Sequence, residues 1–234
     1  MRFIILDNMT LEEVGKGLLR TAQSSYPRFM TIMSHKEKEY RRKAIKGGQG
    51  RLDFKTINVQ MENITFHICP YSFGKHDYKK YGLSFCLLAS FKHQRKDMYC
   101  LFSNYGTGLQ IYTRHFFERY VERHLKDNSE VTINLVRKYF RETECVCRVE
   151  SVEREGYDNS VCGGTNIGTC CGYKVCENVY VFKTYIDEET LSRGDKRKVF
   201  DESQPLIKPV GMDALGNRIY PQQLLEMMLS EAAA

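Results

Sequence analysis

The chain has 234 residues, of which 42% are hydrophobic and 27% are charged, and its formal net charge is +6. This length can bury a substantial core, and one domain with appendages is expected rather than two full domains. No apolar run is long enough to cross a bilayer, and the hydrophobic stretch before Asp7 is too short for a secretory signal. We therefore expect a cytoplasmic protein without membrane contact, whose positive charge favours RNA, DNA or an acidic protein as its partner.

The chain has nine cysteines, an odd number, and we expect no signal sequence. Both observations argue against an extracellular disulfide framework. Cys86 and Cys100 lie within apolar runs, where a thiol usually acts as a small buried side chain. Cys145, Cys147 and the group at 170–176 lack the paired C-x-x-C spacing of zinc sites, so a zinc or redox role is the less favoured alternative. The common zinc-protease, P-loop and serine-hydrolase motifs are also missing. The sequence therefore predicts no metal and no cofactor.

Residues 1–50 are predicted to form an N-terminal helical extension. Thr10 and Glu13 have the spacing of a capping box, which predicts a helix from there to about Gln23. Pro27 is expected to begin a second helix, because proline suits the first helical turn. Three glycines then end the helical region, at positions 47, 48 and 50.

Residues 51–190 are predicted to form the core domain, because the apolar pattern changes there to a period of two. Two hairpins are expected, the first with a tight turn at Glu62-Asn63 and the second with a charged loop at 93–96. The Gly-rich segment 156–175 is expected to be a long hairpin tip or a mobile flap. The predicted strands cover residues 57–61, 64–69, 83–91, 98–103, 109–112, 145–152 and 178–186.

Two helices are predicted after the strand at 109–112. The first covers 114–125 with Thr113 as its N-cap, and the second starts near Ser129. The fold class is therefore α+β, with an antiparallel sheet of about six strands and two central helices packed on it. A C-terminal tail at 191–234 is expected to end in a helix that begins at Pro221. The inward-facing side chains of the first central helix are predicted to include Phe116, Phe117, Tyr120 and Val121.

The opposite side of that helix carries His115, Arg119 and Arg123, spaced four residues apart. His115 lies in the first turn, where the helix dipole tends to lower the pKa of an imidazole, so it could act as a general base. The two guanidinium groups could bind a phosphate and stabilise developing charge. We expect this row to border a concave basic site, covered by the segment 156–175. The alternative is a solvated charged face, because glutamates lie beside the row.

Two other groups of cations are candidates. The basic run from His35 to Arg51 is expected to place four cations near one helix face, with Tyr40 able to stack on a base. Glutamates dilute this charge, so a solvated helix face is the alternative. Lys183 ends an apolar strand, and it either snorkels at the edge of the sheet or lies in a cleft. The candidate nucleic-acid-binding residues of the basic run are Lys36, Arg42, Lys43 and Lys46.

The strand at 109–112, the helix of the form H-x-x-x-R-x-x-x-R and the closing strand with the pair Lys183-Thr184 resemble the small bacterial ribonuclease toxins of the BrnT and RelE kind. This similarity spans residues 109–186, about a third of the chain. It implies a barnase-like α+β fold in which helices pack on an antiparallel sheet. The chain departs from that pattern by its long β-rich segment before the helix and by its Gly/Cys-rich segment.

The resemblance also implies a function. His115 would act as the acid or base at an RNA phosphate, Arg119 and Arg123 would bind that phosphate, and Lys183 would assist. The expected function is thus that of an intracellular nucleic-acid-interacting protein, in this case a metal-independent ribonuclease. The alternative is a non-catalytic binding or assembly protein of a mobile genetic element, in which the same row is an interaction surface.

Overall fold

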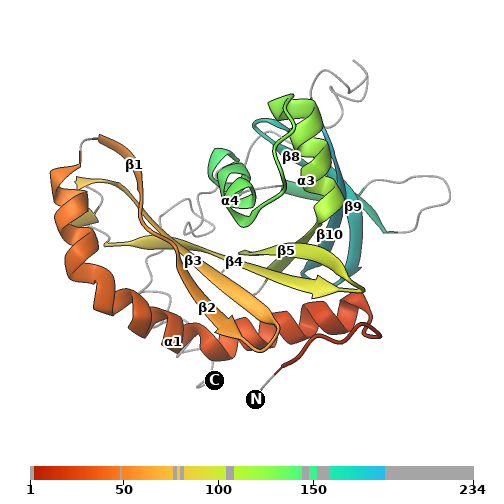
Figure 1. Cartoon of the computed structure of the whole chain (residues 1–234), viewed down its shortest axis with the longest axis horizontal. Coiled ribbons are helices and arrows are strands. Elements are labelled where there is room, and N and C mark those ends of the chain that lie inside the picture. The colour runs from red at the N-terminus through yellow and green to blue at the C-terminus, as the bar shows by residue number, and fades with distance from the viewer. Residues whose placement is uncertain are drawn as a thin grey trace.

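The computed structural model describes residues 3–47, 49–75, 78–79, 82–103, 108–143, 148–151 and 159–187. These residues form three layers, with one long helix on one face of a ten-stranded sheet and two shorter helices on the other (Figure 1). The predicted α+β class is confirmed. Cys145, Cys147 and the predicted tail helix lie outside the described residues. Within the described ranges, no helix combines the length and the apolar character that a membrane crossing requires.

The long helix is α1 (Leu11–Lys46), and it begins at the predicted capping box. The backbone N–H of Glu13 donates to the Thr10 hydroxyl at 3.2 Å, and the Glu13 carboxylate accepts from the Thr10 N–H at 2.7 Å. The prediction that a second helix begins at Pro27 is wrong, because Pro27 lies inside one continuous helix. An interior proline costs about 3 kcal/mol. The apolar face of α1 is buried on both sides of Pro27, at Ala22 and Phe29, and this burial outweighs the cost.

The helix α1 is curved along its length (Figure 1). Figure 1 shows that α1 curves along the sheet and turns up beside β1 at its C-terminal end. Interior prolines are a common cause of such bends. The helix ends at Gly47, as predicted, and the N–H of that residue donates to the carbonyl of Lys43 at 2.9 Å.

The sheet has ten strands rather than about six. Nine of them follow the order β1-β3-β4-β5-β6-β10-β9-β8-β7, and the tenth, β2, also pairs with β3. All pairs are antiparallel except β6 with β10, which is parallel, so the expectation of a purely antiparallel sheet is corrected. The strands are β1 (Gln49–Asp53), β2 (Ile57–Met61), β3 (Ile64–Gly74), β4 (Ser84–His93), β5 (Lys96–Ser103), β6 (Gly108–Thr113), β7 (Arg148–Ser151), β8 (Ser160–Thr165), β9 (Gly168–Cys176) and β10 (Val179–Ile186).

Both predicted hairpins are present, as β2 with β3 and as β4 with β5. The Gly-rich segment also forms a hairpin, from β8 and β9, but this hairpin lies inside the sheet between β7 and β10. The expectation of a mobile flap is therefore wrong for the described residues 159–175. Its glycines hid the strand pattern, because strand propensity is low for glycine and the pairing comes from neighbours distant in sequence.

Successive side chains of the central strands point to opposite faces and supply two separate cores. In β4, Leu87 and Ala89 pack toward α1, whereas Cys86 and Leu88 pack toward the two shorter helices. Apolar side chains on both faces are typical of a central strand, and β4 lies between β3 and β5.

The shorter helices lie on the second face. α3 (Arg114–Tyr120) is capped by Thr113, whose hydroxyl accepts from the Phe116 N–H at 3.2 Å, as predicted. A π-helical turn, η2 (Val121–Leu125), continues it. α4 (Ile133–Glu142) begins four residues later than predicted, after the N-cap Thr132. The inward-facing residues predicted for the first helix, Phe116, Phe117, Tyr120 and Val121, are all buried.

We predict that Phe117→Ala lowers the free energy of unfolding by about 3–5 kcal/mol through cavity formation. Phe117 is fully buried, and its ring lies 5.4 Å from that of Tyr99 and 5.6 Å from that of Tyr139. For a chain of this size, thermal unfolding should shift down by roughly 6 °C or more. The exposed neighbour variant Glu122→Ala should change stability by less than about 0.5 kcal/mol. A shift below about one degree for Phe117→Ala would show that this face of the helix contributes no packing.

Candidate functional site

The predicted row on the first helix is brought together only in part. His115 and Arg119 lie on the exposed side of α3, and the Arg119 Nε donates to the His115 Nε2 at 3.4 Å. Arg123 lies in the π-helical turn, where each turn contains more residues than in an α-helix. It points toward β10 instead, and its Nη1 donates to the Tyr185 carbonyl at 2.6 Å. The predicted row of three side chains therefore contains only His115 and Arg119, because Arg123 points elsewhere.

The carboxylates of α3 compensate the charges of this face. The Arg119 guanidinium donates to Glu122 at 2.5 Å, and His115 lies 3.6 Å from Glu118. The side chain of His115 is 55% exposed and that of Arg119 is 37% exposed. Such surface pairs contribute little free energy and leave little net positive potential. The alternative of a solvated charged face therefore describes this part of the helix.

Lys183 lies apart from the row. The register of β10 against β9 shifts between Phe182 and Thr184, so Lys183 is the extra residue of a β-bulge. Its ammonium group lies 4.7 Å from the centre of the Tyr173 ring, on an exposed side chain. The alternative that placed Lys183 at the edge of the sheet is wrong, because β10 lies between β6 and β9. In a regular strand, Thr184 would share a face with Phe182. Because of the bulge, Tyr185 takes that place, and it packs in the same core as Phe182.

The cations predicted on α1 do come together. They surround one surface hollow near the C-terminal end of the helix, and this hollow also contains Glu39. Glu39 accepts from Lys43 at 2.8 Å. Tyr40 cannot stack on a base as predicted, because it is buried against Phe54 with a ring separation of 4.8 Å. The cations around this hollow are Lys36, Lys38, Arg42, Lys43 and Lys46.

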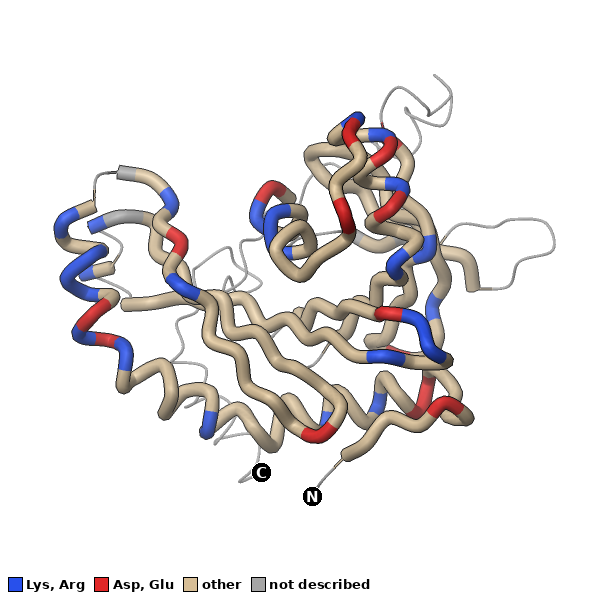
Figure 2. Tube along the Cα trace, in the orientation of Figure 1, with Lys and Arg blue, Asp and Glu red and all other residues tan. Residues whose placement is uncertain are grey.

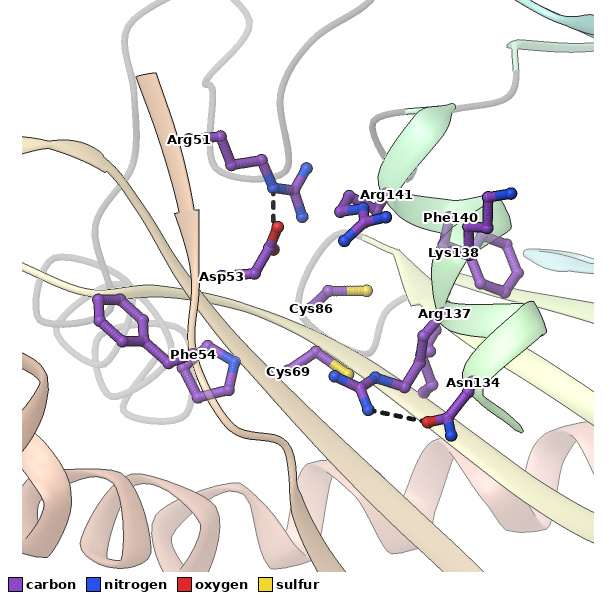
Figure 3. Close-up of a pocket in the computed structure, with 12 residues that line it drawn as sticks. Arg51, Asp53, Phe54, Cys69, Cys86, Asn134, Arg137, Lys138, Phe140 and Arg141 are labelled. Atoms are coloured by element: carbon purple, nitrogen blue, oxygen red, sulfur yellow. Dashed lines mark hydrogen bonds and ion pairs between the residues drawn. The ribbon is translucent and has the colours of Figure 1, made fainter. Parts of the chain in front are cut away.

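A second basic site, which the sequence did not predict, lies between β1 and α4. It is a pocket of about 220 Å³ on the sheet face that carries α4, and we call it the cationic cleft. Arg51 stands on one wall, and Arg137, Lys138 and Arg141 stand on the other. Figure 3 shows the guanidinium groups of Arg51, Arg137 and Arg141 pointing into the same space. In Figure 2, lysines and arginines occur along α4 and from the end of α1 into β1.

The described carboxylates close to the cations of this cleft are those of Asp53 and Glu142. The cleft is lined by one carboxylate, that of Asp53, which lies 3.1 Å from the Arg51 Nε. Lys138 lies 3.8 Å from Glu142. Arg137 donates to the Asn134 amide oxygen at 3.4 Å, and no described residue pairs with the Arg141 guanidinium. Among the described side chains, the four cations of the cleft thus outnumber the carboxylates close to them, Asp53 and Glu142, in contrast to the face of α3.

The floor of the cleft is formed by strands and contains sulfur and apolar groups. Cys69 of β3 and both Cys86 and Leu88 of β4 line it. Phe54, Pro70 and Phe140 complete the apolar part of the lining. The phenyl ring of Phe54 also packs against α1, so the same residue supports the cleft and the basic end of α1.

A hydrogen-bonded triad of side chains lies beside this floor, on three neighbouring strands. The imidazole of His67 is hydrogen-bonded through Nδ1 to the Asn58 amide oxygen and through Nε2 to the Ser90 hydroxyl, each at 2.9 Å. His67 is only 4% exposed. Burial, and then the positive charge of Arg137, lower its pKa to about 4. The imidazole is therefore neutral at pH 7, and its two nitrogens fix the hydrogen bonds across the strands.

The cleft could not be predicted from the sequence, because the residues of its two walls are far apart in the chain. Arg51 follows the glycines after α1, whereas Arg137 and Arg141 share one face of a helix that begins more than eighty residues later. The spacing in α4 was a readable signal, since its apolar stripe leaves these arginines on the outer side. The position of Arg51 opposite them depends on the pairing of β1 with β3, which no local pattern encodes.

Among the described residues, no group of three or more His, Cys, Asp or Glu side chains could hold a metal ion. No protein-family model matches this chain, and no curated protein or solved structure matches it either. The candidate site is accordingly argued from its geometry and charge alone.

We predict that stability falls as the pH is lowered from about 6.5 toward 4 because of His67. The folded state lowers the pKa of this imidazole, so the stabilising contribution is complete above the unfolded value and is lost on acidification. Between about pH 7 and pH 5, the loss should be on the order of 2 kcal/mol in urea unfolding. His67→Gln, which does not titrate, should reduce this pH dependence. The exposed His35→Gln control should retain it, and equal slopes in the two variants would contradict the assignment.

Proposed function

We propose that this protein binds single-stranded nucleic acid, and that the cationic cleft holds its phosphodiester backbone. The observation that carries this proposal is the convergence of Arg51, Arg137 and Arg141, from two separate walls, on one space. A guanidinium group can donate two parallel hydrogen bonds to a phosphate, and several of them around one space favour a polyanion.

The size of the cleft favours a single strand. Its volume of about 220 Å³ lies below the range of about 300–1,000 Å³ that is usual for drug-sized ligands. It can accept one sugar-phosphate unit at a time, and a flexible strand can lead further units along the protein. The mixed floor, with Cys69 and Leu88, suits the apolar faces of a sugar or base.

The basic end of α1 supports the proposal as a second contact for the backbone. Phe54 lines the cleft and packs on α1, so the two cationic surfaces share a support. A single strand that leaves the cleft over β1 would meet Lys43 and Lys46 near the end of that helix. This contact adds electrostatic affinity without sequence preference.

Binding, rather than cleavage, is the activity that the geometry favours. A ribonuclease built on His115 requires cations aimed at the same phosphate as the imidazole. Arg119 is paired with Glu122, and Arg123 is bound to a backbone carbonyl of β10. The triad around His67 is equally unsuited to act as a general base near neutral pH, because the pKa of His67 is about 4. The proposed protein is therefore a non-catalytic binder of nucleic acid.

We predict that the double variant Arg137→Gln/Arg141→Gln weakens binding of a fluorescein-labelled oligouridylate and reduces its salt dependence. Each lost phosphate contact on a single strand should reduce the slope of log K against log salt by about 0.7, so the double variant should lose about 1.4. The measurement is fluorescence anisotropy over a series of salt concentrations.

The matched control is Arg20→Gln/Arg28→Gln, which removes the same charge from exposed positions of α1 on the opposite face of the sheet. It should leave the slope within about 0.3 of the wild-type value. Equal slopes in the two double variants would exclude the cleft from the interface. The same oligouridylate incubated in EDTA should stay intact, and metal-independent cleavage that is lost in His115→Ala would establish the ribonuclease alternative.

A further inference from the structure

Two cysteines face each other in the β8–β9 hairpin. Cys162 of β8 and Cys171 of β9 are direct partners in the antiparallel register, and their Sγ atoms lie 3.4 Å apart. Both side chains belong to regular strands that are fixed on both sides, since β8 pairs with β7 and β9 pairs with β10. The two sulfur atoms are therefore held near each other by the sheet itself.

The backbone geometry of this pair is compatible with a disulfide bond. Directly opposed residues of antiparallel strands have Cα atoms roughly 4.5 or 5.5 Å apart, and disulfides span about 4.4–6.8 Å between Cα atoms. The Sγ atoms must approach from 3.4 Å to about 2.05 Å, a change that small side-chain rotations can supply. No rearrangement of the hairpin is needed.

We propose that Cys162 and Cys171 form a redox modification site, which closes reversibly into an intrachain disulfide on exposure to a small peroxide. In this reaction one thiolate attacks a peroxide oxygen, breaks the O–O bond and becomes a sulfenic acid. The second thiol attacks that sulfur and displaces water, so the two cysteines lose two electrons and two protons in total. One molecule of hydrogen peroxide is thereby reduced to two molecules of water. A dithiol reductant reverses the reaction by thiol–disulfide exchange.

Accessibility selects the reagent. Cys162 is 9% exposed and Cys171 is 7% exposed, so a bulky disulfide such as oxidised glutathione is hindered at this pair, and the oxidant proposed here is a peroxide because of its small size. The adjacent Cys170 is a poor competitor. It points to the opposite face of β9, is fully buried, and its Sγ lies 3.0 Å from the Tyr139 hydroxyl.

The test is differential alkylation of the wild-type chain, which needs no variant to fold. The protein is treated with hydrogen peroxide, denatured and alkylated with iodoacetamide, then reduced and alkylated with N-ethylmaleimide. The tryptic peptide that ends at Lys174 contains Cys162, Cys170 and Cys171, so fragment spectra assign each label. We expect the maleimide label to rise at least about tenfold at Cys162 and Cys171 together, with Cys170 unchanged, and dithiothreitol before denaturation to abolish it.

Variants then test the partnership. Cys162→Ser should remove the label from Cys171, whereas Cys176→Ser, a control at a half-buried cysteine of β9, should leave both labels in place. The proposal is overturned if the label appears on Cys170, if Cys162 or Cys171 is paired with any other cysteine, or if the pair stays reduced while Cys69 and Cys176 are oxidised. Oligouridylate binding is measured separately, so the failure of one proposal does not decide the other.

Discussion

The aromatic cluster around Tyr112 fixes the position of α4, and the cationic cleft depends on that position. Tyr112 lies in β6, and its ring is 4.9 Å from Phe116, 5.0 Å from Phe140 and 5.1 Å from Phe182. It therefore joins α3, α4 and β10 at one point of the sheet. Its hydroxyl is satisfied by the Gln110 side chain at 2.7 Å, so burial of this ring leaves no polar group without a partner. Such a cluster stabilises both the fold and the direction in which α4 points.

The inward face of α4 dictates what its outer face can do. Val136, Tyr139 and Phe140 are buried in this cluster. Arg137 and Arg141, which follow Val136 and Phe140 in sequence, therefore project over β3 and β4. A helix packed so firmly holds its cations in place, and less conformational entropy is lost when they bind a phosphate. By contrast, the cations of α3 pair with glutamates on their own helix. The same residue types thus differ in function because of their neighbours.

The parts of the fold that the sequence predicted are those encoded locally. The capping box of Thr10, the N-cap Thr113 and the turn at Glu62-Asn63 each depend on a few adjacent residues, and each was found. The errors concern long-range effects. Pro27 is tolerated because the buried face of α1 continues past it, and the Gly-rich hairpin becomes part of the sheet because strands on both sides pair with it. Propensity gives way to tertiary packing in both cases.

The candidate site follows the same rule. Charges that are close in sequence, such as Lys43 and Lys46, could be grouped from the helical period, and the structure groups them. Charges that meet only through strand pairing, such as Arg51 and Arg137, could not. The row on the first helix failed for a subtler reason, since the change from α to π geometry after Tyr120 redirects Arg123. A helical wheel assumes one constant angle per residue, and here that assumption ends within the predicted helix.

The two proposed sites lie on opposite faces of the sheet, which makes them physically separable. Cys171 shares its side of β9 with Tyr173, which packs toward α1, whereas the cleft lies on the face that carries α4. A disulfide at Cys162 and Cys171 would therefore not enter the cleft. One route between them exists through the strand itself, because the neighbouring Cys170 contacts Tyr139 of α4. Through that contact, oxidation would change the position of α4 and not the charge of the cleft.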